Sequence, residues 1–230
     1  MQNPQIFFWI TFIGIAILSW VVQYNLKRKF EKYSKITLSH GMAGADVARK
    51  MLKDNGINDV QVICTPGRLT DHYNPMDKTV NLSDGVYQSD SVMAAAVAAH
   101  ECGHAVQHAK AYAPLTLRSK LVPVVAFSSN WVMWVLLVGV LTIEMFPAIL
   151  GLGIALFGFT TLFSFITLPV EIDASKRALV WLRGAGITDN HTQDYATSAL
   201  KSAAYTYVVA ALGSLATLIY YIMIFVGRRD

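Results

Sequence analysis

Two histidines and a glutamate stand close enough together in the sequence to bind and use a metal ion. They belong to the segment His100-Glu101-Cys102-Gly103-His104, within an alanine-rich stretch that predicts a helix. Residues four apart lie on one helix face, about 6 Å apart along the axis, so both imidazoles can reach one zinc ion. Glu101 projects about 100° around the helix from His100, where it can accept a proton from a water at the metal. The spacing therefore predicts a catalytic zinc site with Glu101 as general base.

The residues around this motif favour a buried site over a solvated helix face. Apart from Glu101 and the two histidines, residues 97–106 carry no charge, whereas a solvated helix usually also displays Lys and Glu. Cys102 points away from the metal face, so we interpret it as a small packing residue. With Cys64 as the only other cysteine, the chain is no disulfide scaffold.

A catalytic zinc normally takes three protein ligands and leaves a fourth position open. His108 is one turn beyond His104, but a straight helix places it about 12 Å from His100, too far for one ion. We therefore expect His108 among the residues that surround the ligands. Glu171 is the favoured third ligand of a single zinc ion, and Asp173 is the competing candidate, otherwise expected to orient a histidine. The alternative for Glu171 is a carboxylate that only stabilises a helix N-terminus.

Four stretches without Asp, Glu, Lys or Arg are long enough to cross a membrane, since each exceeds the roughly 20 residues that a spanning helix needs. The chain is 54% hydrophobic and only 15% charged, whereas soluble domains carry about 25% charge. The first stretch has no basic segment before it and no cleavage site after it, so we interpret it as a retained anchor and not as a signal peptide. The predicted transmembrane segments are residues 1–26, 121–170 as a hairpin of two helices turning at Glu144, and 202–227.

The basic residues predict how these segments are oriented. Of the 19 Lys and Arg residues, 13 lie in residues 27–120 and 4 in residues 171–201. The positive-inside rule places both charged segments in the cytoplasm and the N-terminus outside. Only Arg228 and Arg229, after the last stretch, disagree with this orientation. The sequence thus predicts a multi-pass protein of the cell membrane whose active site faces the cytoplasm.

The larger charged segment has the pattern of a small mixed α+β domain. We expect a helix over residues 42–55 capped by Ser39, strands at 59–64 and 79–82, and a long helix capped by Ser89 or Asp90. In the second segment, Pro169 is expected to begin a helix that stops at Gly184. A further helix should begin near residues 188–192 and continue into the last apolar stretch.

Three motifs resemble the YugP-type neutral zinc metallopeptidases of bacteria. They are Ala-Ala-His-Glu-Cys-Gly-His-Ala-Val-Gln-His at residues 98–108, Leu-Thr-Asp-His-Tyr-Asn-Pro at 69–75 and Leu-Pro-Val-Glu-Ile-Asp-Ala-Ser at 168–175. The resemblance covers almost the whole chain, and it extends more distantly to gluzincins of the HtpX and CAAX-prenyl-protease type. It implies a mainly α membrane protein of four transmembrane helices with a small α+β, zincin-like cytoplasmic domain.

The resemblance also implies a zinc endopeptidase with His100, His104 and Glu171 as ligands and Glu101 as base. In the distant group an Asp usually stands four residues after the ligand glutamate, whereas this chain has Ser175 there. The oxyanion formed during peptide hydrolysis needs a further donor. We consider His72 first, because it lies in one of the three motifs, and the other candidates are Tyr73, Arg177, Tyr205 and Tyr207.

The expected partners are a polypeptide substrate, which includes membrane proteins or their cytoplasmic tails, and the lipid bilayer. The strand at residues 79–82 is expected to be an edge that pairs with an extended peptide. No basic face with interleaved aromatics is present, which argues against nucleic acid. The sequence does not fix the oligomeric state.

Two other functions fit parts of the pattern. An intramembrane protease would carry the histidines on a spanning helix, but residues 90–110 contain no Leu, Ile or Phe and several polar groups. A non-catalytic, zinc-containing membrane scaffold or regulatory subunit needs no base, so Glu101 argues against it.

Overall fold

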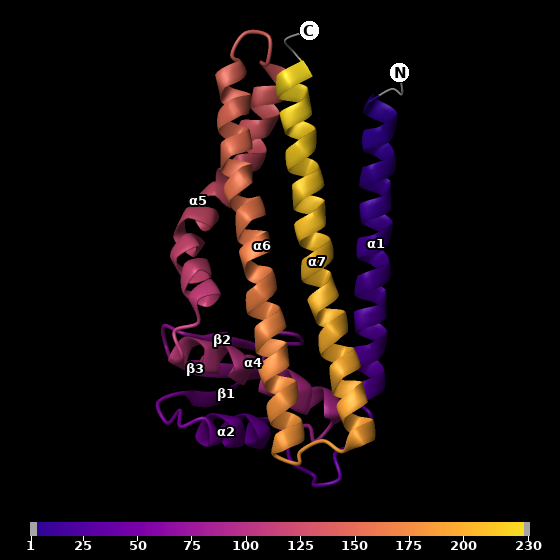
Figure 1. The fold of residues 1–230 in the computed structure, drawn as a ribbon, viewed down its shortest axis with the longest axis vertical. Coiled ribbons are helices and arrows are strands. Elements are labelled where there is room, and N and C mark those ends of the chain that lie inside the picture. Colours follow the sequence, from indigo (N-terminus) through magenta and orange to yellow (C-terminus); the bar gives the residue numbers. More distant parts are fainter. Residues whose placement is uncertain (1–3, 228–230) are drawn as a thin grey trace. The chain divides into compact units, whose positions relative to one another are not determined.

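The computed structural model describes residues 4–227 and is mostly helical (Figure 1). The prediction of four long apolar helices is confirmed, since α1, α5, α6 and α7 each contain a segment long and apolar enough to cross a membrane. A small sheet and three shorter helices make up the rest. The helices are α1 (Pro4–Tyr33), α2 (Gly44–Asp54), α3 (Asp84–Tyr87), α4 (Val92–Ala109), α5 (Ala113–Leu141), α6 (Pro147–Gly184) and α7 (Asn190–Gly227), and the strands are β1 (Gln61–Thr65), β2 (His72–Asn74) and β3 (Thr79–Ser83).

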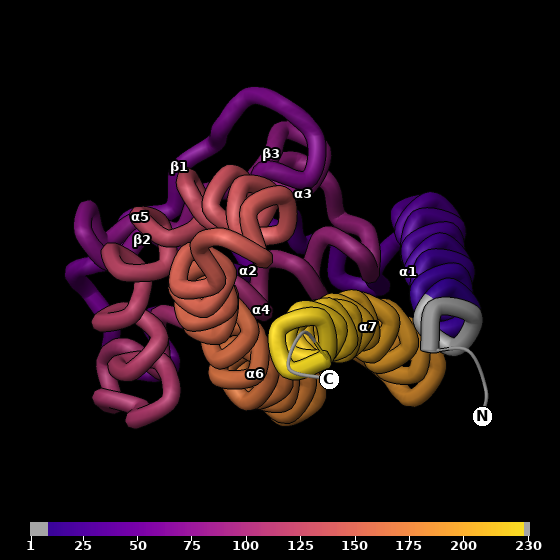
Figure 2. Tube along the Cα trace, turned by 90° about the horizontal axis from the view of Figure 1, so that it is seen from above, coloured from indigo at the N-terminus to yellow at the C-terminus, as the bar shows by residue number. Residues whose placement is uncertain are grey.

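The chain divides into two compact units. One consists of apolar parts of α1, α5, α6 and α7, and the other of residues 22–116 and 169–205. Within the first unit, Leu136 of α5 and Leu150 of α6 are fully buried and pack with Phe225 of α7, and Figure 2 shows the end of α7 beside α6. A Cβ at Gly139 would stand 2.6 Å from the Leu150 Cα, so a glycine permits α5 and α6 to approach here.

The sheet of the second unit has the strand order β1-β3-β2. β1 runs parallel to β3 and β2 antiparallel to it. β3 is therefore the central strand, and the prediction that residues 79–82 form an edge is wrong. The burial agrees, because Val80 and Leu82 of β3 are fully buried. The edge next to α4 is β2, a strand of three residues that the sequence pattern did not predict.

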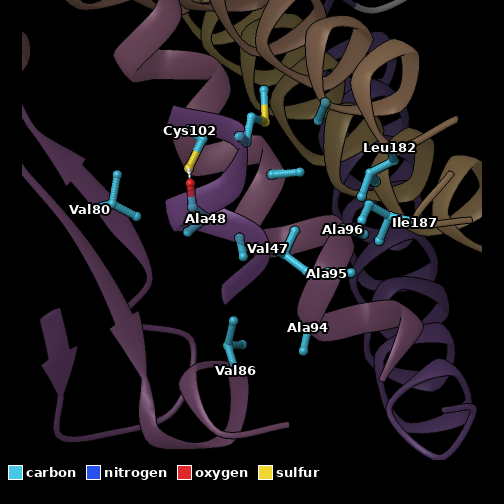
Figure 3. Packing of buried hydrophobic residues seen from close by; sticks show 14 of the residues in the cluster. Val47, Ala48, Val80, Val86, Ala94, Ala95, Ala96, Cys102, Leu182 and Ile187 are labelled. Atoms are coloured by element: carbon cyan, nitrogen blue, oxygen red, sulfur yellow. Dashed lines mark hydrogen bonds between the residues drawn. The ribbon is translucent and has the colours of Figure 1, made fainter. Parts of the chain in front are cut away.

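Side chains of α2, α4, β3 and α6 pack together in the core of the second unit (Figure 3). Val47 and Ala48 of α2 are fully buried against the alanine-rich side of α4. The Cys102 thiol is also fully buried and donates a hydrogen bond to the Ala48 carbonyl at 3.5 Å. Small side chains on α4 allow this close packing, and the role of Cys102 as a packing residue follows directly.

Two predicted helix caps differ from the structure. Ser39 does not cap α2, whose N-cap residue is Ala43 without a side-chain hydrogen bond. α4 is capped by Ser91, which accepts the N–H of Ala94 at 3.2 Å, and not by Ser89 or Asp90. Serine and aspartate are both good caps, so the sequence could not distinguish three neighbouring candidates.

The structure also corrects the prediction that a helix begins at Pro169. α6 continues without a break from Pro147 to Gly184, with Pro169 in its interior. A proline inside a helix removes one backbone hydrogen bond because it has no N–H, a cost that α5 also carries at Pro123. Glu171 is consequently far from a helix N-terminus, and the helix dipole does not explain a carboxylate at this position.

Candidate metal centre

Three side chains of the second unit form a compact group of metal-binding atoms. His100 and His104 lie on α4 and Glu171 on α6, and one donor atom of each lies within 4.8 Å of the other two. The Glu171 Oε2 is 3.2 Å from the His100 Nε2 and 3.6 Å from the His104 Nε2. Tetrahedral zinc with bonds of about 2.0–2.1 Å places its ligand atoms about 3.3 Å apart. The two carboxylate–imidazole distances are close to that value.

The surroundings of this group also suit a metal ion. The side chains of His100, His104 and Glu171 are only 15%, 10% and 5% exposed. A carboxylate is expensive to bury unless a cation compensates its charge. Two imidazole nitrogens and one carboxylate oxygen are a donor set found in catalytic zinc sites. Both the geometry and the chemistry of the three residues fit zinc.

The close approach of α4 and α6 brings the three residues together. A Cβ at Gly103 would stand 2.6 Å from the Ala174 carbonyl oxygen, so only glycine fits here without a shift of backbone. On α6, Val170, Ala174 and Ala178 are fully buried at four-residue spacing, which gives this helix a narrow, smooth face. Glu171 is adjacent to that face and reaches the histidines because the two helix backbones are in contact.

Gln107 determines the orientation of His104. Its side chain is completely buried, and its amide nitrogen donates to the Val170 carbonyl at 2.8 Å and to Asp173 Oδ2 at 2.9 Å. Both amide hydrogens are thereby used, so the amide oxygen faces His104 Nδ1 at 3.0 Å and accepts a hydrogen bond from its N–H. With the proton on Nδ1, the Nε2 of His104 keeps a lone pair for the metal.

Ser175 takes the corresponding place beside His100. Its hydroxyl lies 3.1 Å from His100 Nδ1, which it reaches because it is one helical turn after Glu171. Asp173 contacts Gln107 and the Arg177 Nε, so it reaches His104 through Gln107. The sequence reasoning missed both Gln107 and Ser175. Their spacing, three residues after His104 and four after Glu171, was the available signal.

Glu101 lies beside the group without belonging to it. It is only 9% exposed, and its Oε2 accepts the backbone N–H of Tyr73 at 3.1 Å. Tyr73 pairs with Val80 in the β2–β3 ladder, yet its N–H points to α4. The outer edge of β2 therefore faces Glu101.

The other predicted site residues lie around this edge strand or on the long helices. His72 is exposed, and its Nδ1 lies 2.7 Å from the Thr70 carbonyl. His108 shares a 2.8 Å hydrogen bond through Nδ1 with the Tyr73 hydroxyl. Neither contact involves the three metal-binding candidates, and the predicted catalytic role of His72 stays a prediction. Among the remaining oxyanion candidates, Arg177 pairs with Asp173, and Tyr205 and Tyr207 are 58% and 38% exposed on α7.

The electrostatics of the group favour a positive charge on His104 when no metal is bound. Burial disfavours the imidazolium, but the hydrogen bond with Glu171 and the charges of Glu101 and Glu171 outweigh it. The pKa of His104 is therefore raised above its ordinary value. The same negative charges that attract a proton to this site also attract a metal cation.

Comparison with known proteins agrees with a zinc site. Residues 8–226 match a protein family described as "Putative neutral zinc metallopeptidase". Over 226 residues the chain is 42% identical to "Putative membrane protease YugP" of Bacillus subtilis (strain 168), which covers 98% of this chain and 99% of that protein. No solved structure matches the chain. The chain belongs to this family of neutral zinc metallopeptidases, as its motifs suggested.

Proposed function

We propose that the protein is a membrane-embedded zinc endopeptidase that hydrolyses peptide bonds at the cytoplasmic face. The observation that carries the proposal is the buried group of His100, His104 and Glu171 with Glu101 beside it. A non-catalytic zinc-containing scaffold needs at most the three metal-binding candidates, and not Glu101. A carboxylate held next to them by the Tyr73 N–H, yet outside the group, is what a general base requires.

The three grouped residues would hold one zinc ion, and Gln107 and Ser175 keep the two imidazoles oriented for it. When bound, zinc supplies a Lewis acid that polarises a carbonyl and makes a water molecule more acidic. Glu101 then accepts a proton from the attacking water at a carboxylate oxygen and passes it to the leaving amine. The backbone N–H of Tyr73 keeps this carboxylate in one place during both transfers.

The outer edge of β2 favours an extended polypeptide as the substrate. Edge strands bind extended peptides through main-chain hydrogen bonds, and β2 is the edge that faces Glu101. A peptide that added to β2 would pass directly over the proposed base. The sequence analysis predicted that residues 79–82 pair with the peptide. Because β3 is the central strand, we assign this pairing to β2 instead.

We further propose that the active site faces the cytoplasm with the N-terminus outside, and that membrane proteins or their cytoplasmic tails are substrates. The distribution of Lys and Arg supports the orientation. Glu171 follows the apolar stretch of α6 along one continuous helix. Its position soon after a membrane segment suits substrates that emerge from the bilayer.

The test compares the full-length protein, purified in detergent, with Glu171→Ala and Glu101→Gln for zinc content and casein cleavage. We expect about one zinc per chain in the wild type. Glu171→Ala should lose both zinc and activity. Glu101→Gln should keep zinc, because its amide oxygen can still accept the Tyr73 N–H, and lose activity. Glu31→Gln, the same change at an exposed position on α1, is the matched control and should change neither property.

The results also separate the proposal from its alternatives. A Glu171→Ala variant that keeps its zinc would make Asp173 the next candidate ligand. A wild type that holds zinc but cuts no substrate, or a Glu101→Gln variant that keeps its effect in cells, would support the non-catalytic scaffold instead.

A further inference from the structure

Tyr73 of β2 is attached to α4 at both of its ends. Its backbone N–H donates to Glu101 Oε2 at 3.1 Å, and its hydroxyl shares a 2.8 Å hydrogen bond with His108 Nδ1. His108 comes seven residues after Glu101, which is about two helical turns, so both residues lie on the same face of α4. One residue of β2 therefore connects the proposed base to the C-terminal end of α4.

The position of the Glu101 carboxylate depends on that residue. Within residues 4–227, the Tyr73 N–H is the one hydrogen-bond donor to this carboxylate. Glu101 is only 9% exposed, and a buried carboxylate that loses its donor is unfavourable. Because the donor is a backbone group, its place is set by the position of β2. Whatever holds β2 in place therefore also holds the proposed base.

The sheet alone holds β2 weakly. β2 is a strand of three residues, shorter than the average of about 5–6, and it pairs with β3 on one side only. The side chains of His72 and Asn74 make local hydrogen bonds, with the Thr70 carbonyl and with Asp77. In the described part of the chain, the Tyr73–His108 bond is the only hydrogen bond that a side chain of β2 makes to α4.

The chemistry of this pair suits a residue that holds a strand. A tyrosine hydroxyl can both donate and accept, so it can bond to the His108 Nδ1 whether the imidazole is neutral or protonated. The two rings also lie close together, with their centroids 5.9 Å apart. The contact therefore does not depend on the charge of His108, as it would if His108 transferred a proton.

We propose that His108 is a positioning residue of the peptidase. By holding the Tyr73 hydroxyl it fixes β2 against α4, and the Tyr73 N–H then keeps the Glu101 carboxylate in place. The proposal rests on the proposed function and adds to it a residue outside the metal-binding group.

The test measures kcat and KM for casein cleavage by the full-length, zinc-loaded protein in detergent, together with hydrogen exchange of residues 70–76. Tyr73→Phe removes only the hydroxyl, and His108→Phe removes Nδ1 but keeps a ring. His108→Asn is the conservative variant, because its amide stands where Nδ1 stood and can bond to the hydroxyl. Tyr87→Phe is the matched control, since it removes a tyrosine hydroxyl of the second unit that bonds to Arg49 at 2.6 Å.

Tyr73→Phe and His108→Phe should each lower kcat about two- to tenfold, the effect of losing one ordinary hydrogen bond. The double variant should be no slower than either single variant, because both remove the same bond. Residues 70–76 should exchange faster in all three, while zinc content stays at the wild-type level. His108→Asn should recover most of the kcat that His108→Phe loses, and Tyr87→Phe should keep the wild-type kcat.

Two results would overturn the proposal alone. One is an unchanged kcat in Tyr73→Phe and His108→Phe. The other is a change confined to KM, which would show that the bond shapes only the edge that binds the peptide. A wild type that holds zinc but cuts no casein would overturn the proposed function, and this proposal with it.

Discussion

Gly103 on α4 lies directly against the backbone of Ala174 on α6, so that a Cβ at residue 103 would stand 2.6 Å from the Ala174 carbonyl oxygen. His104 follows Gly103 on α4, and Glu171 lies about one turn before Ala174 on α6. The distance between the two helix backbones therefore decides whether the carboxylate reaches the imidazoles. A glycine without any ligand atom is part of what makes the metal centre possible.

Gly103→Ala should weaken zinc binding by about tenfold or more. The added methyl group must move α6 away from α4, and overpacking of this kind costs about 1–3 kcal/mol. Gly184→Ala, on α6 and with open space around the new methyl group, is the control and should bind zinc normally. Competition with a chelator of known affinity measures both variants. Equal zinc affinity in the two would show that the close contact does not position Glu171.

Gln107→Leu should lower zinc affinity or activity by about 10–100-fold, the range seen when a partner of a metal-binding histidine is removed. The substitution leaves His104 Nδ1 without its acceptor and removes the donor to Asp173. Gln193→Leu is a suitable control, because Gln193 also bonds a backbone carbonyl, that of Leu179, but lies away from the site. If both variants lose thermal stability and only Gln107→Leu loses zinc, Gln107 acts on the metal site itself.

As the pH is lowered, zinc affinity should begin to fall at a higher pH than at an ordinary histidine site. Zinc needs a neutral imidazole, and Glu171 raises the pKa of His104 in the metal-free protein, so protons already compete at or above pH about 6.5. The ion pair itself stabilises the metal-free protein below pH about 6.5, and this contribution is lost as the pH rises through the raised pKa. Titration of the metal-free protein by histidine NMR measures this pKa. In Glu171→Gln the pKa of His104 should drop, because the carboxylate that raises it is gone. An unchanged pKa would refute the ion pair.

Cys64 should report the orientation of the protein in the membrane. Its thiol is exposed on β1, whereas Cys102 is fully buried. A membrane-impermeant maleimide should therefore label inside-out vesicles and leave intact cells unlabelled, with Cys64→Ser as the unlabelled control. The hydrogen bond to Asp84 raises the pKa of the Cys64 thiol, so long reaction times are needed. Labelling of intact cells would place the active site outside.

The sequence could predict the elements whose signal is local. The apolar stretches gave four helices because length and composition alone decide whether a helix suits a membrane. The relative positions of His100, Glu101 and His104 could likewise be predicted, because all three lie on one helix and follow from helix geometry.

What the sequence could not predict depends on contacts between elements. Pro169 is a common first residue of a helix, and nothing local shows that α6 continues through it. The central position of β3 depends on pairing with β2, a strand of three residues too short to produce a pattern. Gln107 and Ser175 acquire their roles only because Gly103 allows α4 and α6 to meet.

The order of the ligands along the chain has a consequence for biosynthesis. His100 and His104 are translated before all of α5 and most of α6, and Glu171 comes only after them. A nascent chain therefore cannot complete its metal-binding set until two strongly apolar helices have left the ribosome. The proposed activity therefore requires translation past Glu171, and a chain truncated before that residue would lack one of the three metal-binding candidates.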